Sequence, residues 1–585
     1  MTEQSLSTYP LKELPQYQSA LSLEQFMGES NTKEGLFSFR QIMQEDEDEA
    51  YPLSTFQALN EWGFPHYYVP GHLGGRFRQA EESAFLMRLV ARRNLTLAIT
   101  HGASLVGIMP MWISGSEEQQ LKAAEEIKAG KRFAIGLSER FHGSDIAAND
   151  FTAEEAAATE FMVSGQKWLI NHAIRGEYIT MLSRTDQKHV MRDYSLMLID
   201  KSQYDESHFE FERIKTVGLR GLDLGGIEVK NLPLSADCMI GRRGIGLETI
   251  IKALQVTRFM CVIFSLGAAD TALRTSIQFL GQRKLYNGYA IDIPIVRQKI
   301  VHHTADLLCC EAFSMVGSRM LHVLPKEFSL VSAIAKGVLP DMVDELIHES
   351  GLLFGARALL REEFNFGIFQ KMKRDHSIIS VFDGNTAVNL QYLIGQMRPI
   401  AKKEIGDYEA TVAMSKKIFC LDQQLSDLTF DRLSLFSRRK DFLKDALWAA
   451  DQTLSVSNDP DDIQLRELTQ SFIRSWEQLD RDILADDANI ANTYTIPPHY
   501  FEFAKTFSLL HVASACINLW IYNAEKRGGA LFQAHWMTNA LKRLLTHMGH
   551  PLKDWDEEAE KQALGEVKEM VQQSQLISII PFTVK

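Results

Sequence analysis

Two stretches decide the fold of this 585-residue chain: FAIGLSERFHGSD at residues 133–145 and SGQKWLIN at residues 164–171. Gly143 and Ser144 allow close approach of the backbone to a bound group and supply a small hydroxyl donor. Trp168 offers a wide apolar face that stacks well on a planar ring. These residues suit a planar cofactor with polar edges and phosphates.

Working outward, the hydrophobic pattern divides the chain into five regions. Helical spacing, as in Phe85-Leu86-Leu89-Val90, precedes the two stretches, and short alternating segments such as residues 195–198 surround them. Long helical patterns follow. We therefore expect an N-terminal arm (1–50), a helical N-terminal domain (51–130), a β middle domain (131–240), a helical bundle (241–400) and a helical C-terminal extension (401–585). The arm ends in the acidic run 45–49, which we expect to be a solvated helix face or arm.

Composition narrows the class of protein. A net charge of −13 argues against a general nucleic-acid surface, which needs a basic face. Six cysteines without a CxxC motif are typical of reduced thiols, and His302-His303 lack the spacing of a metal site, so no metal is expected. The N-terminus carries no leader pattern, the C-terminus is not a peroxisomal address, and the uncharged run 506–523 is too polar for a free-standing membrane span. We expect a cytoplasmic protein.

The two decisive stretches resemble the flavin-facing segments of the acyl-CoA dehydrogenase family. Further motifs follow in the order of that family from about Glu47 to Arg398, beginning with Gly63-Phe64 and the turn at residues 69–75. The resemblance implies a mainly α fold with a central β-barrel domain between a helical N-terminal domain and a helical bundle. It also implies FAD as the cofactor.

The resemblance assigns cofactor contacts to the β domain. It places Ser138 at the pyrimidine edge of the flavin, Gly143 and Ser144 at the pyrophosphate, and Trp168 beside the flavin ring. Ile170 stands where many relatives have a Thr or Ser near flavin N5, so backbone donors would have to replace that hydroxyl. Arg140 and Phe141-His142 also depart from the family pattern, which puts the shape of this loop in question.

Two further positions match residues of the helical bundle in that family. Arg283 matches an Arg that reaches the FAD pyrophosphate of a neighbouring subunit, and Tyr286 takes the place of an aromatic residue that packs by the flavin. The planar, five-donor guanidinium of Arg suits a diphosphate. Arg258 matches an Arg near the catalytic carboxylate, and Thr257 before it excludes the alternative position of the base found in some relatives.

In the last of the family's motifs, this chain differs from the family at the residue that acts as the catalytic base. Residues 381–386, VFDGNT, resemble a segment in which Glu removes the α-proton of an acyl thioester while hydride passes from Cβ to the flavin. Here the carboxylate is Asp383, whose reach is about one methylene shorter, and a misplacement near 1 Å can cost on the order of 10²-fold in rate. The resemblance makes Asp383 and Arg258 the catalytic residues and Gly384 and Thr386 cofactor contacts.

Three hypotheses stay open for this site. The first is FAD-dependent α,β-dehydrogenation of an acyl thioester, either acyl-CoA or acyl-carrier protein, to the trans-2-enoyl thioester. The second is a flavin oxidase resembling nitroalkane oxidase, which uses Asp as its base. The third is a degenerate family member with a binding or regulatory role, which the loss of the Glu and of the hydroxyl at Ile170 favours.

About a third of the chain lies beyond the family region, in helical segments. Its length and place resemble the extension of very-long-chain acyl-CoA dehydrogenases, which covers the surface where a second dimer would pack. The resemblance implies a homodimer and an electron-transfer flavoprotein as the electron acceptor. No basic amphipathic helix supports membrane contact, and the aromatic residues of residues 501–522 are expected to form a core of the extension itself.

Overall fold

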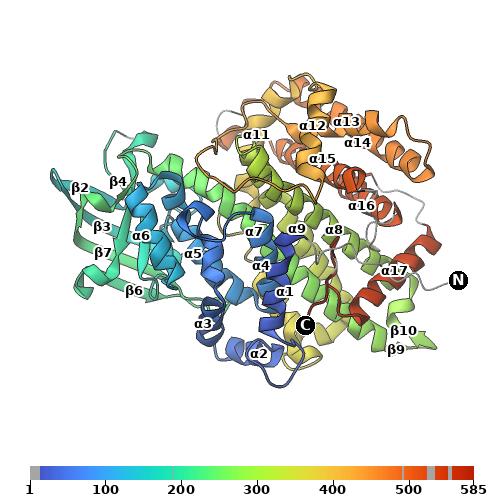
Figure 1. Ribbon diagram of the computed structural model, residues 1–585, viewed down its shortest axis with the longest axis horizontal. Coiled ribbons are helices and arrows are strands. Elements are labelled where there is room, and N and C mark those ends of the chain that lie inside the picture. Colours follow the sequence, from blue (N-terminus) through green and yellow to red (C-terminus); the bar gives the residue numbers. More distant parts are fainter. Residues whose placement is uncertain (1–13, 189, 491–492, 524–533, 551–555, 581) are drawn as a thin grey trace.

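The computed structural model describes residues 14–188, 190–490, 493–523, 534–550, 556–580 and 582–585. Helices dominate, around one sheet domain. Figure 1 shows the sheet domain as a lobe at the left, the long helices in the centre, and most helices of the extension at the upper right, with the last one lower on the right. The order of helical, sheet and helical regions agrees with the expected fold class.

Six helices precede the sheet domain. They are α1 Pro15–Met27, α2 Phe39–Glu47, α3 Leu53–Trp62, α4 Ala80–Arg93, α5 Leu95–Ser114 and α6 Glu117–Lys128. Asn94 caps α5 by accepting a hydrogen bond from the N–H of Leu97, and Ser116 with Gln119 forms a capping box on α6. These caps satisfy backbone donors that a helix start leaves without partners.

The described part of the expected N-terminal arm is packed into the molecule. Tyr17 and Leu23 of α1 are buried, at most 1% exposed. Within the acidic run, Asp46 is 3% exposed, and the guanidinium of Arg374 donates to its carboxylate at 2.6 Å. The expectation of a solvated acidic face is therefore wrong at Asp46, because a partly buried cation on α10 requires a carboxylate partner.

The sheet domain holds eight strands. They are β1 Phe133–Gly136, β2 Thr152–Ala157, β3 Glu160–Asn171, β4 Tyr178–Arg184, β5 Tyr194–Asp200, β6 Phe209–Arg213, β7 Leu224–Ser235 and β8 Met239–Ile240. Their order is β6-β7-β3-β2-β4-β5-β8, and β1 pairs with β4 in parallel. A core of its own lies within this domain, with Phe151, Met181 and Leu232 fully buried.

The sheet does not close into the expected barrel. β6 and β8 stand at the two ends of the strand order, and no pairing joins them among the described residues. A barrel requires a hydrogen-bonded neighbour on both sides of every strand. β8 supplies only two residues, which pair with β5, so an open sheet replaces the barrel.

The helical bundle and the extension share one hydrophobic core. The bundle consists of α7 Gly246–Gln282, α8 Pro294–Val323, α9 Phe328–Phe354, α10 Ile368–His376 and α11 Thr386–Ala401, with the hairpin β9 Lys284–Leu285 and β10 Gly288–Tyr289. The extension consists of α12 Tyr408–Phe419, α13 Phe442–Leu454, α14 Pro460–Ala485, α15 His499–Asn523, α16 Ala534–His547 and α17 Glu557–Gln572. Phe507 and Trp520 are buried as expected, but their cluster is continuous with that of α4, α7 and α8. The extension is thus joined to the bundle rather than centred on a separate core.

Two helices, α5 and α7, have the length and apolar composition of membrane spans. In each, 83% of the apolar window is buried inside the protein. Their apolar character is therefore accounted for by their place in the core.

Candidate active site

Asp383 lies in the segment between α10 and α11. Its φ of 54° is left-handed, which is uncommon for a residue other than Gly, and Gly384 follows with a φ of 87°. Thr257 Oγ1 donates to Asp383 Oδ2 at 3.0 Å, and Arg258 Nε donates to the backbone oxygen of Asp383 at 2.7 Å. A Cβ on residue 384 would lie 2.7 Å from the Arg258 guanidinium, so only Gly fits there. Two neighbours on α7 thus hold both the carboxyl and the carbonyl group of Asp383.

The Asp383 carboxyl group has one constrained and one available oxygen. Oδ2 accepts from Thr257 and lies 3.8 Å from the Cys261 thiol, whereas Oδ1 makes no hydrogen bond within the described chain. Burial raises the pKa of Asp383, while the charges of Arg258 and Lys336 and the Thr257 hydrogen bond act in the opposite direction. A carboxylate with a raised pKa is a stronger base than one in water.

A buried relay fixes the start of the segment that carries Asp383. Ser265 Oγ lies 2.8 Å from His376 Nε2, and His376 Nδ1 lies 2.6 Å from Asp344 Oδ1. Ser380 Oγ donates to the other oxygen of Asp344 at 3.2 Å. Ser265 and His376 are fully buried, so the relay joins α7, α9 and the segment instead of facing a substrate.

A buried lysine fixes the middle of the same segment. Lys336 of α9 is fully buried, donates to the backbone oxygen of Ile379, and lies 5.1 Å from the centre of the Phe382 ring. Burial lowers its pKa, and the charge of Asp383 is among the groups that oppose this. Sequence reasoning missed both Lys336 and His376. The signals were a lysine inside the apolar run 328–343 and a histidine directly after Arg374-Asp375.

Ser138 and Trp168 are brought together at the edge of the sheet domain. Ser138 Oγ donates to the backbone oxygen of Trp168 at 2.7 Å, and the N–H of Trp168 donates to the backbone oxygen of Ser138 at 2.9 Å. The next residue, Leu169, has a φ of 60° and forms part of an irregularity in the pairing of β3 with β7. Such bulges redirect side chains and are common beside active sites.

Lys167, next to Trp168, anchors the loop that follows Ser138. Its ammonium is 2.9 Å from the Glu139 carboxylate, and both side chains are buried. Glu139 also accepts from the N–H groups of Asp150 and Phe151 at 2.9 and 3.0 Å. Burial lowers the pKa of Lys167 to about 8, with Glu139 acting against that shift. The lysine of the Gly-X-Lys-Trp motif is therefore structural.

The residues around Trp168 fit the flavin that the resemblance implies. The Trp168 Nε1 donor is buried and has no hydrogen-bond partner within the described chain. A bound group with an acceptor atom could therefore accept a hydrogen bond from it. The Arg140 guanidinium stacks 4.7 Å from the centre of the Trp168 ring and pairs with Glu212 at 2.5 Å. The departure from the family at residue 140 therefore places a cation against the indole ring.

The other predicted cofactor residues of the β domain are less constrained. Gly143 and Ser144 lie in an exposed loop, and a Cβ on Gly143 would meet nothing within 4 Å, so no close approach within this chain requires Gly there. Ile170 is 2% exposed and packs in the sheet core, so its side chain offers nothing to a polar cofactor.

Thr386 and Gly384 adjoin Asp383 at the start of α11. Thr386 Oγ1 donates to Asp341 Oδ1 at 3.1 Å, so its hydroxyl is engaged with α9. Gly384 lies against Arg258, as described above. The set of Thr257, Arg258, Asp383, Gly384 and Thr386 therefore meets in one place.

Arg283 and Tyr286 do not join the other predicted residues. They lie at the β9–β10 hairpin, at the lower right of Figure 1, whereas the sheet domain with Trp168 lies at the far left. Tyr286 is 96% exposed with a φ of 55°, and Arg283 is exposed and makes no ion pair within the described chain. Within one chain these two residues stand apart from the site.

Comparison with known proteins points to the same family as the sequence motifs. Residues 134–232 match the family model of the acyl-CoA dehydrogenase middle domain, and residues 244–397 match that of the acyl-CoA dehydrogenase C-terminal domain. The chain is 22% identical to the probable acyl-CoA dehydrogenase FadE25 of Mycobacterium tuberculosis, over 59% of this chain and 87% of that protein. It is also 22% identical to the caffeyl-CoA reductase-Etf complex subunit CarC of Acetobacterium woodii, over 60% of this chain and 91% of that protein.

A solved structure extends the similarity over the C-terminal helices. The acyl-CoA dehydrogenase of Bacillus anthracis, complexed with FAD, superposes with a TM-score of 0.69 over 97% of this chain and 96% of that one. The identity is 16%, so this match concerns the fold. The extension is therefore part of a fold already seen in a protein of similar length.

Proposed function

The chain belongs to the acyl-CoA dehydrogenase family through its middle and C-terminal domains, and we propose that it is an FAD-dependent oxidoreductase of acyl thioesters. The reaction introduces a double bond between the α and β carbons of the acyl group. The observation that carries this proposal is the held carboxylate of Asp383, with Oδ2 fixed by Thr257 and Oδ1 left for a substrate.

The chain's own groups account for the proton transfer. Asp383 Oδ1 takes the α-proton, and the electron pair of that C–H bond forms the new double bond as hydride leaves the β carbon. When bound, FAD supplies the acceptor for that hydride. The N–H of Asp383 makes no hydrogen bond within the described chain, so it is available to polarise the thioester carbonyl and acidify the α-proton. Arg258 and Lys336 favour the ionised form of Asp383 before the reaction.

The shorter reach of Asp383 is offset by how firmly its backbone is held. Ile379 is bound through its carbonyl by Lys336, and Asp383 itself by Arg258. A base positioned in this way loses little orientational freedom when the substrate arrives. Ser138, Gly143, Ser144, Trp168, Gly384 and Thr386 would hold FAD on the same chain.

The site is completed by a second copy of the chain in this proposal. Arg283 and Tyr286 are exposed, and Arg283 lies 25 residues beyond Arg258, about 37 Å along the axis of α7, so these two residues serve a neighbouring cofactor in a homodimer. The acceptor of the electrons is an electron-transfer flavoprotein, which the name of the CarC complex supports for that relative. The proposed location is the cytoplasm.

The test begins with the visible spectrum of the purified protein, with FAD added if the flavin is lost during purification. Acyl-CoAs of increasing chain length are then added anaerobically, and bleaching of the flavin band is followed. Bleaching by at least one chain length, abolished in Asp383→Asn and kept in the exposed control Glu118→Gln, is expected.

Other outcomes of that test would lead elsewhere. Reduction by nitroalkanes and by no acyl-CoA would identify an oxidase of another carbon acid, the alternative that an Asp base suggests. Reduction of the flavin only by an acyl group on a carrier protein would identify that protein, instead of coenzyme A, as the carrier of the thioester. A protein that fails to bind FAD would contradict an enzymatic role.

A further inference from the structure

Residues 421–441 cross from α12 to α13 without helix or strand, and we call them the strap. The strap lies outside the matched family domains. Its first part is tied to residues before α4, since the N–H of Leu428 donates to the backbone oxygen of Arg78 at 2.9 Å. Its later part is tied to the bundle, where Gln255 Nε2 donates to the backbone oxygen of Ser434 at 2.8 Å.

The second anchor brings the strap next to the catalytic segment. Gln255 precedes Thr257 by two residues on α7, about 3 Å along the helix axis. On α11, Gln396 Oε1 accepts from the N–H of Ser437 at 3.0 Å, and Tyr392 donates to the backbone oxygen of Leu435. The strap therefore runs over the two helices, α7 and α11, that hold Asp383.

A tight basic turn follows these anchors. The N–H of Lys440 donates to the backbone oxygen of Ser437 at 3.2 Å, and the two central residues, Arg438 and Arg439, have φ values of 55° and 69°. Positive φ at both central positions is typical of a type I′ turn, which favours Asn and Gly. Two arginines are strained in this conformation, and such outliers are a reason to look for a function.

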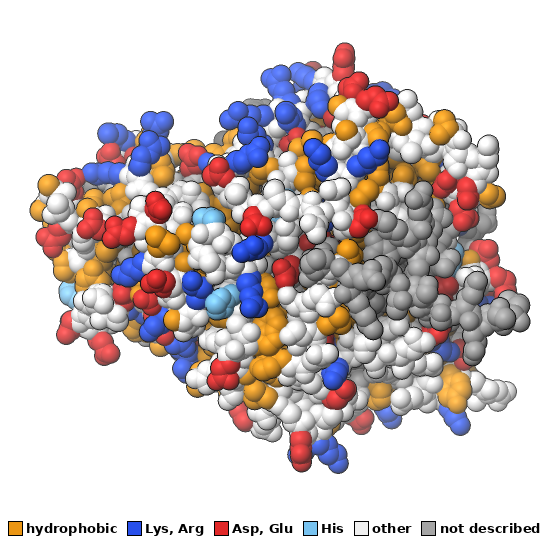
Figure 2. All heavy atoms as spheres, viewed as in Figure 1, with side chains coloured by type: hydrophobic (Ala, Val, Ile, Leu, Met, Phe, Trp, Pro, Cys, Tyr) orange, Lys and Arg blue, Asp and Glu red, His pale blue; other side chains and the backbone are white. Residues whose placement is uncertain are grey.

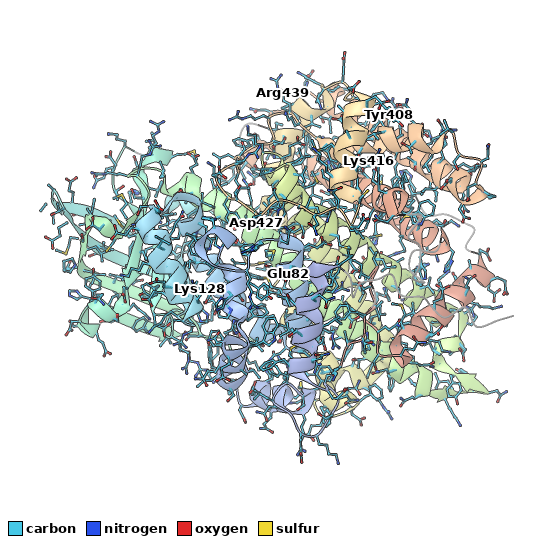
Figure 3. All side chains as sticks on the ribbon, in the orientation of Figure 1. Glu82, Lys128, Tyr408, Lys416, Asp427 and Arg439 are labelled. Atoms are coloured by element: carbon cyan, nitrogen blue, oxygen red, sulfur yellow. The ribbon has the colours of Figure 1, made fainter. Side chains whose placement is uncertain are left out.

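The cations of this turn are unpaired. Arg438 and Arg439 are exposed and make no ion pair or side-chain hydrogen bond within the described chain, and the same holds for Arg432. Figure 2 shows Lys and Arg side chains gathered along the upper edge of the molecule, and Figure 3 places Arg439 there, above α11 and α12. In a chain of net charge −13, these exposed arginines form a local positive patch, which favours binding of an anionic ligand.

An aromatic platform stands beside the cations. The ring of Phe436 is 55% exposed and stacks on the ring of Tyr392, with centroids 5.8 Å apart and an interplanar angle of 10°. An exposed ring next to arginines suits a nucleotide, because the base stacks on the ring and guanidinium groups bind phosphate oxygens.

We propose that Phe436, Arg438 and Arg439 form a subsite for the adenosine 3′,5′-bisphosphate end of coenzyme A. This rests on the proposed function for the thioester that reaches Asp383. The contacts of the strap with Gln255, Tyr392 and Gln396 place this subsite over the two helices that hold Asp383. The aromatic platform favours a nucleotide over the acidic face of a carrier protein, which has no base to stack.

The experiment measures binding of adenosine 3′,5′-bisphosphate to the full chain by calorimetry. The main variant is Arg438→Asn/Arg439→Gly, which removes both charges while supplying residues that a type I′ turn prefers, so its melting temperature should stay equal or rise. The second is Phe436→Leu. The control is Arg474→Gln/Arg481→Gln, which removes two exposed arginines of α14.

We expect the turn variant to bind adenosine 3′,5′-bisphosphate at least about 10-fold more weakly and the control to bind it as the wild type does. In the turn variant KM for acyl-CoA should rise, whereas KM for an N-acetylcysteamine thioester, which lacks the nucleotide, should not change. Unchanged binding in the turn variant, or no binding by the wild type, overturns the subsite. So does strap-dependent binding of acyl-carrier protein without nucleotide binding. Nucleotide binding that needs the strap in a protein whose flavin no acyl-CoA reduces would keep the subsite and overturn the proposed function.

Discussion

At the scale of single residues, the site depends on how Asp383 is charged. Burial favours its neutral form, and Arg258, Lys336 and Thr257 favour its ionised form. The folded carboxyl group binds its proton more tightly than the unfolded one. The stability that this proton contributes is present below the ordinary pKa near 4 and is lost as the pH rises through the folded pKa.

Replacing Asp383 by Asn should therefore stabilise the protein while removing its activity. The melting temperature of Asp383→Asn is expected to exceed that of the wild type by about 2 °C at pH 7, and the difference should shrink toward zero as the pH falls to about 4. Thermal melts of both proteins across that range check this. A difference that is independent of pH would show that the gain does not come from the buried charge.

Lys336 provides a second prediction at this scale. Lys336 lies on α9 and acts on Asp383, and Asp341 of the same helix acts on Lys336. Arg258 and Cys261 of α7 act on both Lys336 and Asp383. In Lys336→Met one of the two cations is lost, so the pKa of Asp383 rises and the acidic limb of kcat/KM moves to higher pH. The pH dependence of kcat/KM measures this, with Lys299→Met as the control. A limb that does not move would restrict Lys336 to a structural role.

The sequence motifs indicated the candidate site residues but not the residues that hold them in place. The positions of Ser138, Trp168, Arg258 and Asp383 follow from short motifs, and the structure places them on the elements that those motifs imply. Lys336 and Asp344 lie far from those motifs in the sequence, and Ser265 follows Arg258 by seven residues within an apolar stretch of the same helix. Their role depends on which helix faces come together, which a local pattern does not contain.

At the scale of elements, the segment 376–384 is fastened to α7 and α9 rather than free. The Ser265–His376–Asp344 relay fixes its start, and Arg258 fixes its end. A carboxylate on such a segment keeps its place without contacts to the substrate. The relay residues are therefore positioning residues.

Removing the relay should reduce turnover more than substrate binding. In His376→Ala, kcat is expected to fall by about 10²-fold with little change in KM, because the base is displaced while the substrate contacts stay. The neighbouring Ser377→Ala, on an exposed residue, serves as the control. His376→Gln, which keeps one hydrogen bond, should recover part of the loss. Equal losses in His376→Ala and Ser377→Ala would contradict the positioning role.

The sheet domain shows that alternating hydrophobicity predicts individual strands but not whether the sheet closes. The pattern of residues 195–198 gave the strand character, and β5 is the strand found there. Closure of the sheet depends on the lengths and pairing of edge strands, and the two residues of β8 are too few to be recognised from sequence.

At the scale of the whole molecule, the predicted cofactor residues are divided between two opposite sides of the folded protein, the sheet domain and the β9–β10 hairpin. Arg283, directly after α7, lies 25 residues beyond Arg258, about 37 Å along the helix axis, so it cannot serve the site that contains Asp383 of the same chain. A dimer in which each hairpin reaches the other chain would be isologous, as most homodimers are.

Mixing two inactive variants tests this division. Arg283→Ala and Asp383→Asn should each be inactive alone, while an equimolar mixture after subunit exchange should recover about a quarter of the wild-type activity. Half of the dimers are then mixed, and one of their two sites is intact. Sedimentation checks the dimer, and turnover checks the recovery. No recovery in a confirmed mixed dimer would place Arg283 outside the neighbouring site.

The segment formed by residues 574–580 and 582–585 has a consequence for how the protein is made. Glu311 accepts from the N–H of Ile579 and Arg88 donates to the backbone oxygen of Ile577 in the buried interior, and Glu24 accepts from the N–H of Lys585 where that residue is partly buried. The ribosome releases this segment after every helix it contacts. Until this segment emerges, the nascent chain therefore holds the charges of α1, α4 and α8 without these partners, and a chain truncated before it would be a substrate for chaperones and proteases.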